Sequence, residues 1–255
     1  MAHIIDLKKK NFHSDMAVDF IKGKSAKISK KKIINGIKVT DIVLRDNNSF
    51  YVNLEFDDIT DYSNYINVKK VFISQMKRLF KKMKIDKKKT CLVIGLGNKD
   101  STFDSLGVKI ANNILVTRYI AKMGNLDENY MNISAITPGI EAQTGISSFE
   151  VIKSVVDTIK PDFVIVIDSL STNSVDRINK NIQISNTGIS PGSGVGDKFK
   201  EISFNTLNVP VLSIGVPTVI SHNNLIITVR EIDYLIEKLS MLISTSINSI
   251  ISNFK

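Results

Sequence analysis

The sequence contains very little of several residue types that mark common kinds of functional site. Among its 255 residues there are one cysteine, three histidines and no tryptophan. A single cysteine cannot form an internal disulfide, and Cys91 lies in an apolar run, which predicts a core residue. His3, His13 and His222 lack both the i, i+4 spacing and the neighbouring cysteines of a zinc site. The sequence therefore predicts no metal and no cofactor.

Long apolar runs are also missing. The stretch "VPVLSIGVPTVI" contains Pro210 and Pro217 and is shorter than the roughly 18 residues that a membrane-spanning helix needs. At the start of the chain the charges follow a very short apolar stretch, which is the wrong order for a secretory signal. We therefore expect a cytoplasmic protein with no membrane partner.

Acidic residues are outnumbered by basic ones, at 25 against 34, which gives a formal net charge of +9. The excess lies in lysine runs such as "KSAKISKKK" and "KKMKIDKKK". Aromatic residues do not alternate with these lysines, so the pattern favours a solvated basic face over a nucleic-acid groove. With 43% hydrophobic and 23% charged residues, the composition is typical of a folded globular chain.

The first third of the chain predicts β structure and one helix. Alternating apolar and polar residues over 32–56 indicate strands, with Asn47 and Asn48 offering a turn. From Asn67 to Lys84 the apolar residues recur at helical spacing and form one stripe. We assign residues 11–85 to this β-rich N-terminal part.

Residues 86–255 change to a repeated pattern of strand, loop and helix. The continuous apolar runs "CLVIGLG", "FVIVID" and "VPVLSIGVP" predict buried strands, and helices are predicted over 104–122, 149–159 and 231–254. Such runs are typical of parallel strands covered by helices on both faces. We predict a single α/β domain over 1–255, with a mostly parallel central sheet flanked by helices and an N-terminal β-rich extension.

Carboxylates follow two of the predicted strands. In an open parallel sheet, ligands gather beyond the carboxyl ends of the strands. Asp168 ends one strand, and Asp104 follows the turn from Gly95 to Gly97. Two such carboxyls can act together as general base and general acid, although an aspartate here can also simply cap a helix or form an ion pair. Asp100, the third candidate, stands where a dinucleotide fingerprint needs glycine, which argues against a nucleotide.

A second glycine-rich stretch, "TGISPGSGVGDK", imitates a phosphate-binding loop incompletely. Asp197 precedes Lys198 and Phe199 follows it, where a phosphate-binding loop has glycine before the lysine and serine or threonine after it. The glycines still allow the backbone to approach a ligand closely and to present N–H groups to it.

Read together, the loops resemble those of one enzyme family. The segments "GLGNKDSTFDSLG", "LVTRYI", "ITPGIEAQTGISSFEVIKSVV", "KPDFVIVIDSLSTNSVDRINKNIQISNTGISPGSGVGDK" and "NVPVLSIGVPTVI" closely resemble, in this order, the spore germination proteases. The match is dense over about residues 91–220. Upstream, "FHSDMAVD" is similar to a stretch near the start of the family's mature chain.

The resemblance implies an endopeptidase that cleaves small acid-soluble spore proteins during germination, and a cytoplasmic location in the forespore or spore core. The family is made as a zymogen that removes a short N-terminal segment from itself, and it assembles as a homotetramer. Here the propeptide would cover about residues 1–10. The family is similar in fold to the hydrogenase maturation peptidases, and an atypical aspartic mechanism has been proposed for it.

Carried across, the two catalytic carboxylates of the family fall on Asp104 and Asp168. We expect Asp168 to act as the general base and Asp104 as its acid partner, with Asp100 a bystander. The resemblance further predicts that the loop starting at Gly188 lines the substrate groove and that its main-chain N–H groups stabilise an oxyanion. The predicted substrate-binding residues of this loop are Gly188, Gly192, Ser193 and Gly194.

Two alternatives remain at this point. In the first, the same acids bind a metal, as in a metal-dependent maturation-type peptidase. In the second, the chain has kept the fold and acts as a non-catalytic binding or regulatory protein.

Overall fold

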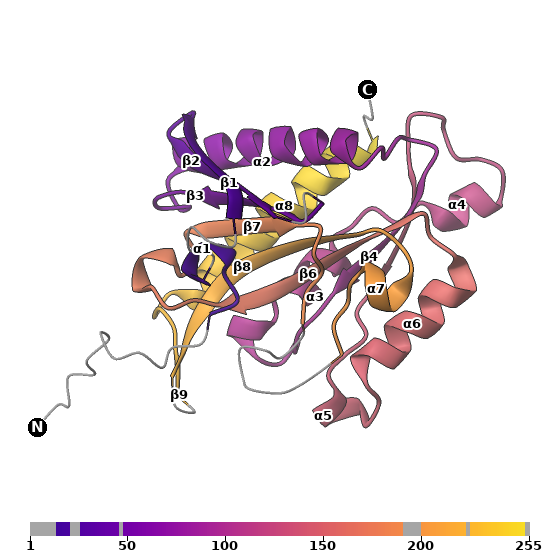
Figure 1. Ribbon diagram of the computed structural model, residues 1–255. Coiled ribbons are helices and arrows are strands. Elements are labelled where there is room, and N and C mark those ends of the chain that lie inside the picture. Colours follow the sequence, from indigo (N-terminus) through magenta and orange to yellow (C-terminus); the bar gives the residue numbers. More distant parts are fainter. Residues whose placement is uncertain (1–13, 21–25, 46–47, 191–199, 223–224, 253–255) are drawn as a thin grey trace, which may run out of the picture.

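The computed structural model describes residues 14–20, 26–45, 48–190, 200–222 and 225–252. Figure 1 shows a central sheet with helices on both of its faces. The strands are β1 (Ala26–Ile34), β2 (Ile37–Leu44), β3 (Phe50–Glu55), β4 (Thr90–Gly95), β5 (Asn132–Ile136), β6 (Phe163–Ser171), β7 (Asn181–Ser185), β8 (Val211–His222) and β9 (Leu225–Ile227). The α-helices are α1 (Ala17–Phe20), α2 (Tyr62–Lys82), α3 (Leu106–Asn112), α4 (Arg118–Lys122), α5 (Glu141–Thr144), α6 (Ser148–Ile159), α7 (Phe204–Leu207) and α8 (Ile232–Ser252), with 3-10 turns η1 (Thr102–Asp104) and η2 (Val175–Arg177).

The sheet has the order β1-β2-β3-β7-β8-β6-β4-β5, and β9 pairs with β8. The half formed by β8, β6, β4 and β5 is parallel. The other half is antiparallel, from β1 through β2 and β3 to β7, which also runs antiparallel to β8. The predicted α/β architecture is confirmed, but the sheet is mixed, because β7 joins the N-terminal strands to the parallel half.

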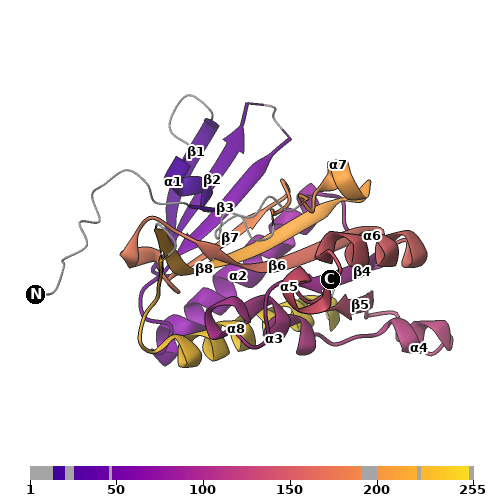
Figure 2. The ribbon, with the colours of Figure 1, turned by 90° about the horizontal axis from the view of Figure 1, so that it is seen from below.

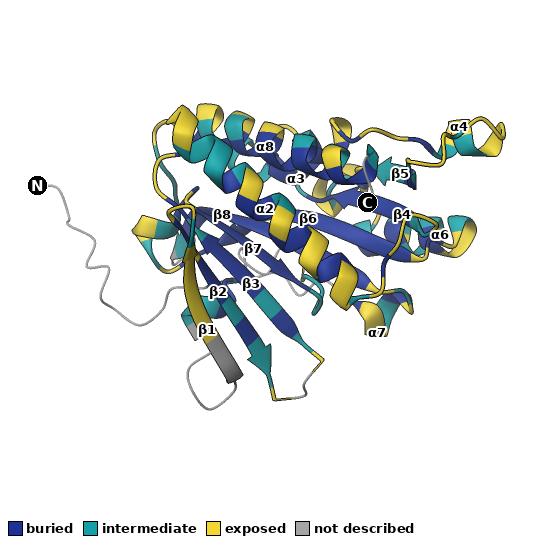
Figure 3. Ribbon diagram, turned by 90° about the horizontal axis from the view of Figure 1, so that it is seen from above, coloured by how far each residue is buried: buried dark blue, intermediate teal, exposed yellow. Residues whose placement is uncertain are grey.

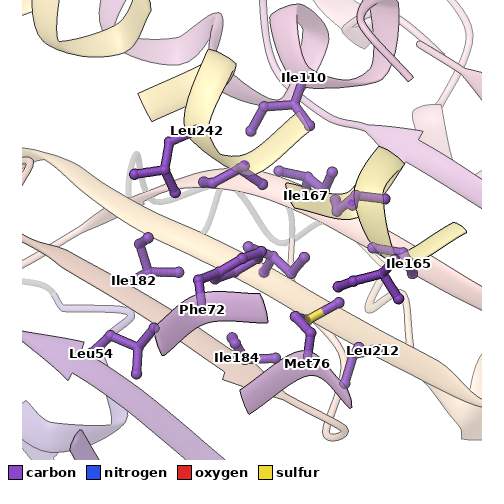
Figure 4. Close-up of a cluster of buried hydrophobic side chains, with 14 of the residues drawn as sticks. Leu54, Phe72, Met76, Ile110, Ile165, Ile167, Ile182, Ile184, Leu212 and Leu242 are labelled. Carbon is purple, nitrogen blue, oxygen red and sulfur yellow. The ribbon is translucent and has the colours of Figure 1, made fainter. Parts of the chain in front are cut away.

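Helices α2, α3 and α8 cover one face of the sheet, and α6 and α7 cover part of the other (Figures 1 and 2). On the first face Phe72 and Met76 of α2 pack against side chains of β3, β6, β7 and β8 (Figure 4). Both are 0% exposed. Since burying one such side chain contributes about 1.5–3 kcal/mol, this layer fixes the position of the strands.

Helix α2 shows how the stripe read from the sequence becomes a buried face. Asp61 caps its first turn by accepting a hydrogen bond from the Asn64 N–H at 2.7 Å. The buried side of the helix points at the sheet and its lysine side faces solvent (Figure 3). The predicted helices over 67–84, 149–159 and 231–254 correspond to α2, α6 and α8. In the part of the chain that the structure describes, none of the helices could span a membrane.

The single helix predicted over 104–122 is wrong. The chain leaves helix α3 at Asn112 and enters α4 at Arg118. Between them the chain contacts the edge of the sheet. The Thr117 N–H donates to the Ile133 carbonyl at 3.0 Å, and the Thr117 hydroxyl donates to the Met131 carbonyl. These bonds to β5 and the residue before it replace the helical ones.

Strands β5 and β7 were not predicted, because "NISAI" and "NIQIS" are short and mix polar with apolar residues. The predicted core role of Cys91 is confirmed, since it is 2% exposed on β4. Burial raises the pKa of its thiol, which keeps it protonated. The turn predicted at Asn47 lies outside the described residues, although β2 and β3 do form a hairpin around it.

Candidate active site

A cleft of about 340 Å³ lies at the carboxyl ends of β4, β6 and β8. Asp104 and Asp168 both line it. This is the edge at which parallel α/β sheets place their ligands. The structure therefore brings the two predicted catalytic residues into one cleft.

The turn after β4 delivers Asp104 to the cleft. Gly97 has φ +109°, and a Cβ there would lie 1.9 Å from the carbonyl oxygen of Asp104. A Cβ on Gly107 would lie 2.4 Å from the carbonyl oxygens of Leu96 and Ile167. Only glycine allows the turn to fold back and α3 to pack this closely against β4 and β6.

The carboxylate of Asp104 is also fixed within this turn. The Asn98 N–H donates to its Oδ2 at 2.9 Å. Burial raises the pKa of Asp104 to about 6, although the hydrogen bond from Asn98 opposes the shift. At neutral pH this carboxyl is therefore mainly ionised and titrates close to the working range of a general acid or base.

Asp168 is more deeply buried, with 6% of its surface exposed. It lies on β6, and the Ser169 N–H donates to its Oδ1 at 2.9 Å. Burial raises the pKa of Asp168 well above its ordinary value, and the negative charges of Asp104 and Asp15 raise it further. Asp168 thus keeps its proton to a higher pH than an ordinary aspartate does.

Asp15 is a third carboxylate of the cleft, and sequence reasoning did not single it out. Its N–H donates to the Ser171 carbonyl at 3.1 Å, and the Ser171 N–H and hydroxyl each donate to its Oδ2 at 2.8 Å. The stretch "FHSDMAVD" had pointed to this segment, but no local pattern reveals that it crosses the end of β6.

The residues after Asp15 are anchored to the body of the protein. Met16 and Ala17 are fully buried. Asp19 forms an ion pair with Arg177 of η2, and the carboxylate of Asp19 is 2% exposed. This N-terminal segment, residues 14–19, is therefore held beside the cleft at both of its ends.

Of the remaining predicted site residues, the structure describes Asp100 and Gly188. Asp100 is at the surface, where Gln143 Nε2 donates to its carboxylate at 3.3 Å. Gly188 has φ +92° and lies next to the bridge between Ile189 and Ile202. Gly192, Ser193 and Gly194 lie outside the described residues.

Other groups complete the lining of the cleft. Lys200 lines it with its ammonium 4.4 Å from the centre of the Phe149 ring, which also faces the cleft. Leu96, Phe103 and Leu170 add apolar surface. Within the described ranges no group of three or more histidine, cysteine, aspartate or glutamate side chains is arranged to hold a metal ion. The cleft thus combines paired carboxyls with apolar walls, which suits acid–base chemistry on a bound ligand.

Comparison with known proteins places the chain in a family. Residues 5–240 match the germination protease family of peptidases. The chain is 35% identical over 259 residues to a germination protease of Bacillus mycoides, covering 93% of this chain and 70% of the relative. It is 38% identical to one from a Geobacillus species, covering 80% of this chain and 58% of the relative. It is 42% identical to one from Bacillus subtilis, covering 73% of this chain and 51% of the relative.

A solved structure is loosely similar: a nickel–iron hydrogenase maturation protease, HycI, from Thermococcus kodakarensis. It has a TM-score of 0.39 and 16% identity, and the match covers 68% of this chain and 97% of that one. The chain spans between about half and 70% of the length of the germination proteases named above. With the family match over residues 5–240 and these identities, the chain belongs to the germination protease family.

Proposed function

We propose that this protein is an endopeptidase that hydrolyses small acid-soluble spore proteins by an aspartic-type mechanism using Asp104 and Asp168. The observation that carries the proposal is the pairing of these two carboxyls in one cleft, where the charge of one raises the pKa of the other. A coupled pair of this kind holds one proton between two acids, which is the state needed to activate water and a carbonyl group together.

The two pKa directions favour an order of roles opposite to the one expected from the sequence. Asp168 is the more buried acid and its pKa is raised by two neighbouring charges, so it keeps the proton. Asp104, with a pKa of about 6, is ionised at neutral pH. In the proposal Asp104 is therefore the general base and Asp168 the general acid.

Each step of hydrolysis then balances. Asp104 takes a proton from water while the water oxygen attacks the scissile carbonyl carbon. The carbonyl oxygen takes the proton of Asp168, which gives a neutral diol. When the C–N bond breaks, Asp104 returns its proton to the leaving nitrogen and one diol hydroxyl returns its proton to Asp168. Both carboxyls end in their starting states.

The proposal includes the other properties implied by the family resemblance. The protein is made as a self-processing zymogen and acts as a homotetramer in the cytoplasm of the forespore or spore core. The expected propeptide, residues 1–10, lies outside the described residues. The net charge of +9 would speed association with acidic surfaces of a substrate, an effect that fades with salt.

Incubation of the purified full-length protein with a small acid-soluble spore protein tests this function. We expect cleavage by the wild type and a loss of at least about 1,000-fold in kcat for Asp104→Asn and for Asp168→Asn. Both variants should keep the wild-type circular dichroism spectrum, because asparagine preserves the volume of the side chain.

Controls separate the alternatives. Activity that is lost with a chelator and restored by one divalent ion would favour a metal-dependent peptidase. An intact substrate at neutral and acid pH, with both full-length and N-terminally truncated protein, would favour a non-catalytic family member. Full activity of Asp168→Asn would refute the two-aspartate mechanism.

A further inference from the structure

Gln183 of β7 holds the main chain of the N-terminal segment. Its Oε1 accepts a hydrogen bond from the Ala17 N–H at 2.7 Å, and its Nε2 donates to the Asp15 carbonyl at 3.4 Å. One primary amide thus binds the peptide groups on both sides of Met16. These contacts use main-chain atoms alone, so they recognise a polypeptide whatever its side chains.

The position of Gln183 relates it directly to Asp168. Asp168 pairs with Gly215 on β8, and Gly215 pairs with Gln183 on β7. Residues that are paired across strands lie on the same face, so Gln183 and Asp168 belong to one row on one face of the sheet. Two strand spacings separate them, or roughly 10 Å between backbones.

The end of β6 also hydrogen-bonds to the N-terminal segment. The Asp15 N–H donates to the Ser171 carbonyl at 3.1 Å, as in the addition of a strand to a sheet edge. Asp15 also lines the cleft that contains both catalytic aspartates. The polypeptide held by Gln183 and Ser171 therefore reaches the catalytic pair.

Burial makes the amide of Gln183 costly unless it is paired. The residue is 8% exposed, and a buried amide without hydrogen-bond partners is destabilising. Its neighbours on β7, Ile182 and Ile184, face the apolar core on the opposite side of the sheet. The amide is thus stabilised by the main chain that lies across it.

We infer that Gln183, with the Ser171 carbonyl, forms a subsite that binds the main chain of a polypeptide substrate beside Asp168. In this structure residues 15–17 of the same chain occupy the subsite. The inference rests on the proposed function, because it assigns a substrate contact to the same cleft. A substrate in this subsite replaces the N-terminal segment.

Binding of a peptide tests the subsite without cleavage. The probe is a fluorescent peptide with the sequence of residues 11–20, and the protein is the full chain carrying Asp104→Asn to stop hydrolysis and Arg177→Gln to loosen its own segment. We expect anisotropy to show that adding Gln183→Leu weakens the affinity about 10-fold, as expected for two lost hydrogen bonds. A peptide with an ester in place of the N–H that matches Ala17 should lose a similar factor.

The protein variant and the ester peptide remove the same contact, so their effects on affinity should not multiply. In the Gln183→Leu protein the ester peptide should bind within about two-fold of the amide peptide. Gln75→Leu is the matched control: Gln75 is 2% exposed but lies on α2, on the opposite face of the sheet. It should leave the affinity unchanged.

Equal affinity of the Gln183→Leu and parent proteins, additive losses, or no binding of the peptide would each overturn the inference. Different results would refute the proposed function and the subsite. Peptide binding that depends on Gln183, without cleavage of a spore protein by the wild type, would refute the protease function and leave the subsite. Cleavage that needs both aspartates but has the same KM and kcat in Gln183→Leu would refute the subsite alone.

Discussion

The parallel and antiparallel halves of the sheet contribute different parts of the cleft. Asp168 lies on β6, and Asp104 lies in η1, after the turn that follows β4. Gln183 comes from β7, which lies between an N-terminal strand and β8. We propose that the parallel half supplies the chemistry and that the antiparallel half supplies the contact with the polypeptide.

This difference follows from the two kinds of strand. Parallel strands all end at one edge, so residues that come after them gather there whatever their distance in the chain. Antiparallel strands alternate in direction, so only their pairing register decides what lies beside the cleft. Perturbing one half at a time should therefore separate loss of chemistry from loss of polypeptide binding.

The largest effect is expected in the parallel half, for Gly107→Ala. The new Cβ would clash with two carbonyl oxygens and push α3 and η1 away from β4 and β6. We expect a loss of about 3 kcal/mol or more in the free energy of unfolding and at least about 100-fold in kcat, measured by denaturant titration and a cleavage assay. In Gly124→Ala the new Cβ has no atom within 4 Å, but φ is +74°, so this control should cost only about 1–2 kcal/mol of backbone strain and leave kcat unchanged; equal losses in both variants would contradict this account of the turn.

The next effect is expected at the N-terminal segment, for Arg177→Gln. It leaves the buried carboxylate of Asp19 without its cation, at a cost of roughly 2–3 kcal/mol because Arg177 is partly exposed. Hydrogen exchange should rise at residues 14–19 and stay unchanged in β4 and β6. Lys153→Gln, which breaks an exposed ion pair with Asp157, should change neither. Protection of residues 14–19 at the wild-type level would show that Arg177 does not hold the segment.

A smaller effect is expected on the pH dependence of stability, through Asp104. Its pKa is raised from 3.8 to about 6 in the folded protein, so the folded state binds more protons than the unfolded state between these values. Stability should therefore fall as pH rises through this window. Asp104→Asn removes the effect and should raise the free energy of unfolding at pH 7 by on the order of 1 kcal/mol. An unchanged slope between pH 4 and 6 in the variant would contradict the assignment.

The same titration should govern activity. If Asp104 is the base, kcat/KM should rise with pH as Asp104 ionises around pH 6. It should fall again at the higher pH where Asp168 loses its proton. A rate that declines steadily through pH 6 would instead support Asp168 as the base.

The smallest effect is expected for Asp100→Asn. Although Asp100 stands in the same loop as Asp104, its side chain lies at the surface with Gln143. We expect a change of less than about two-fold in kcat, since an exposed charge is screened by solvent and salt. A loss comparable to that of Asp104→Asn would show that the loop presents a different carboxyl to the substrate.

Several features could be predicted because their causes are local. The apolar stripe of α2 and the continuous runs of β4 and β6 determine which of their faces are buried. The helix predicted over 104–122 failed because Thr117 bonds to the edge of the sheet instead. The pattern of strand β7 does not predict a strand because three of its five residues are polar, and their burial depends on the strands and the N-terminal segment that cover them.

The sequence by itself determined the α/β class, the helices α2, α6 and α8, and the choice of Asp104 and Asp168 as candidates, since each depends on residues close together in the chain. The tertiary structure decided that the sheet is mixed, that Asp15 adds a carboxylate to the cleft, and that Gln183 hydrogen-bonds to the N-terminal segment. It also decided the burial and the neighbouring charges that raise the pKa of Asp168, because residues distant in the chain supply them.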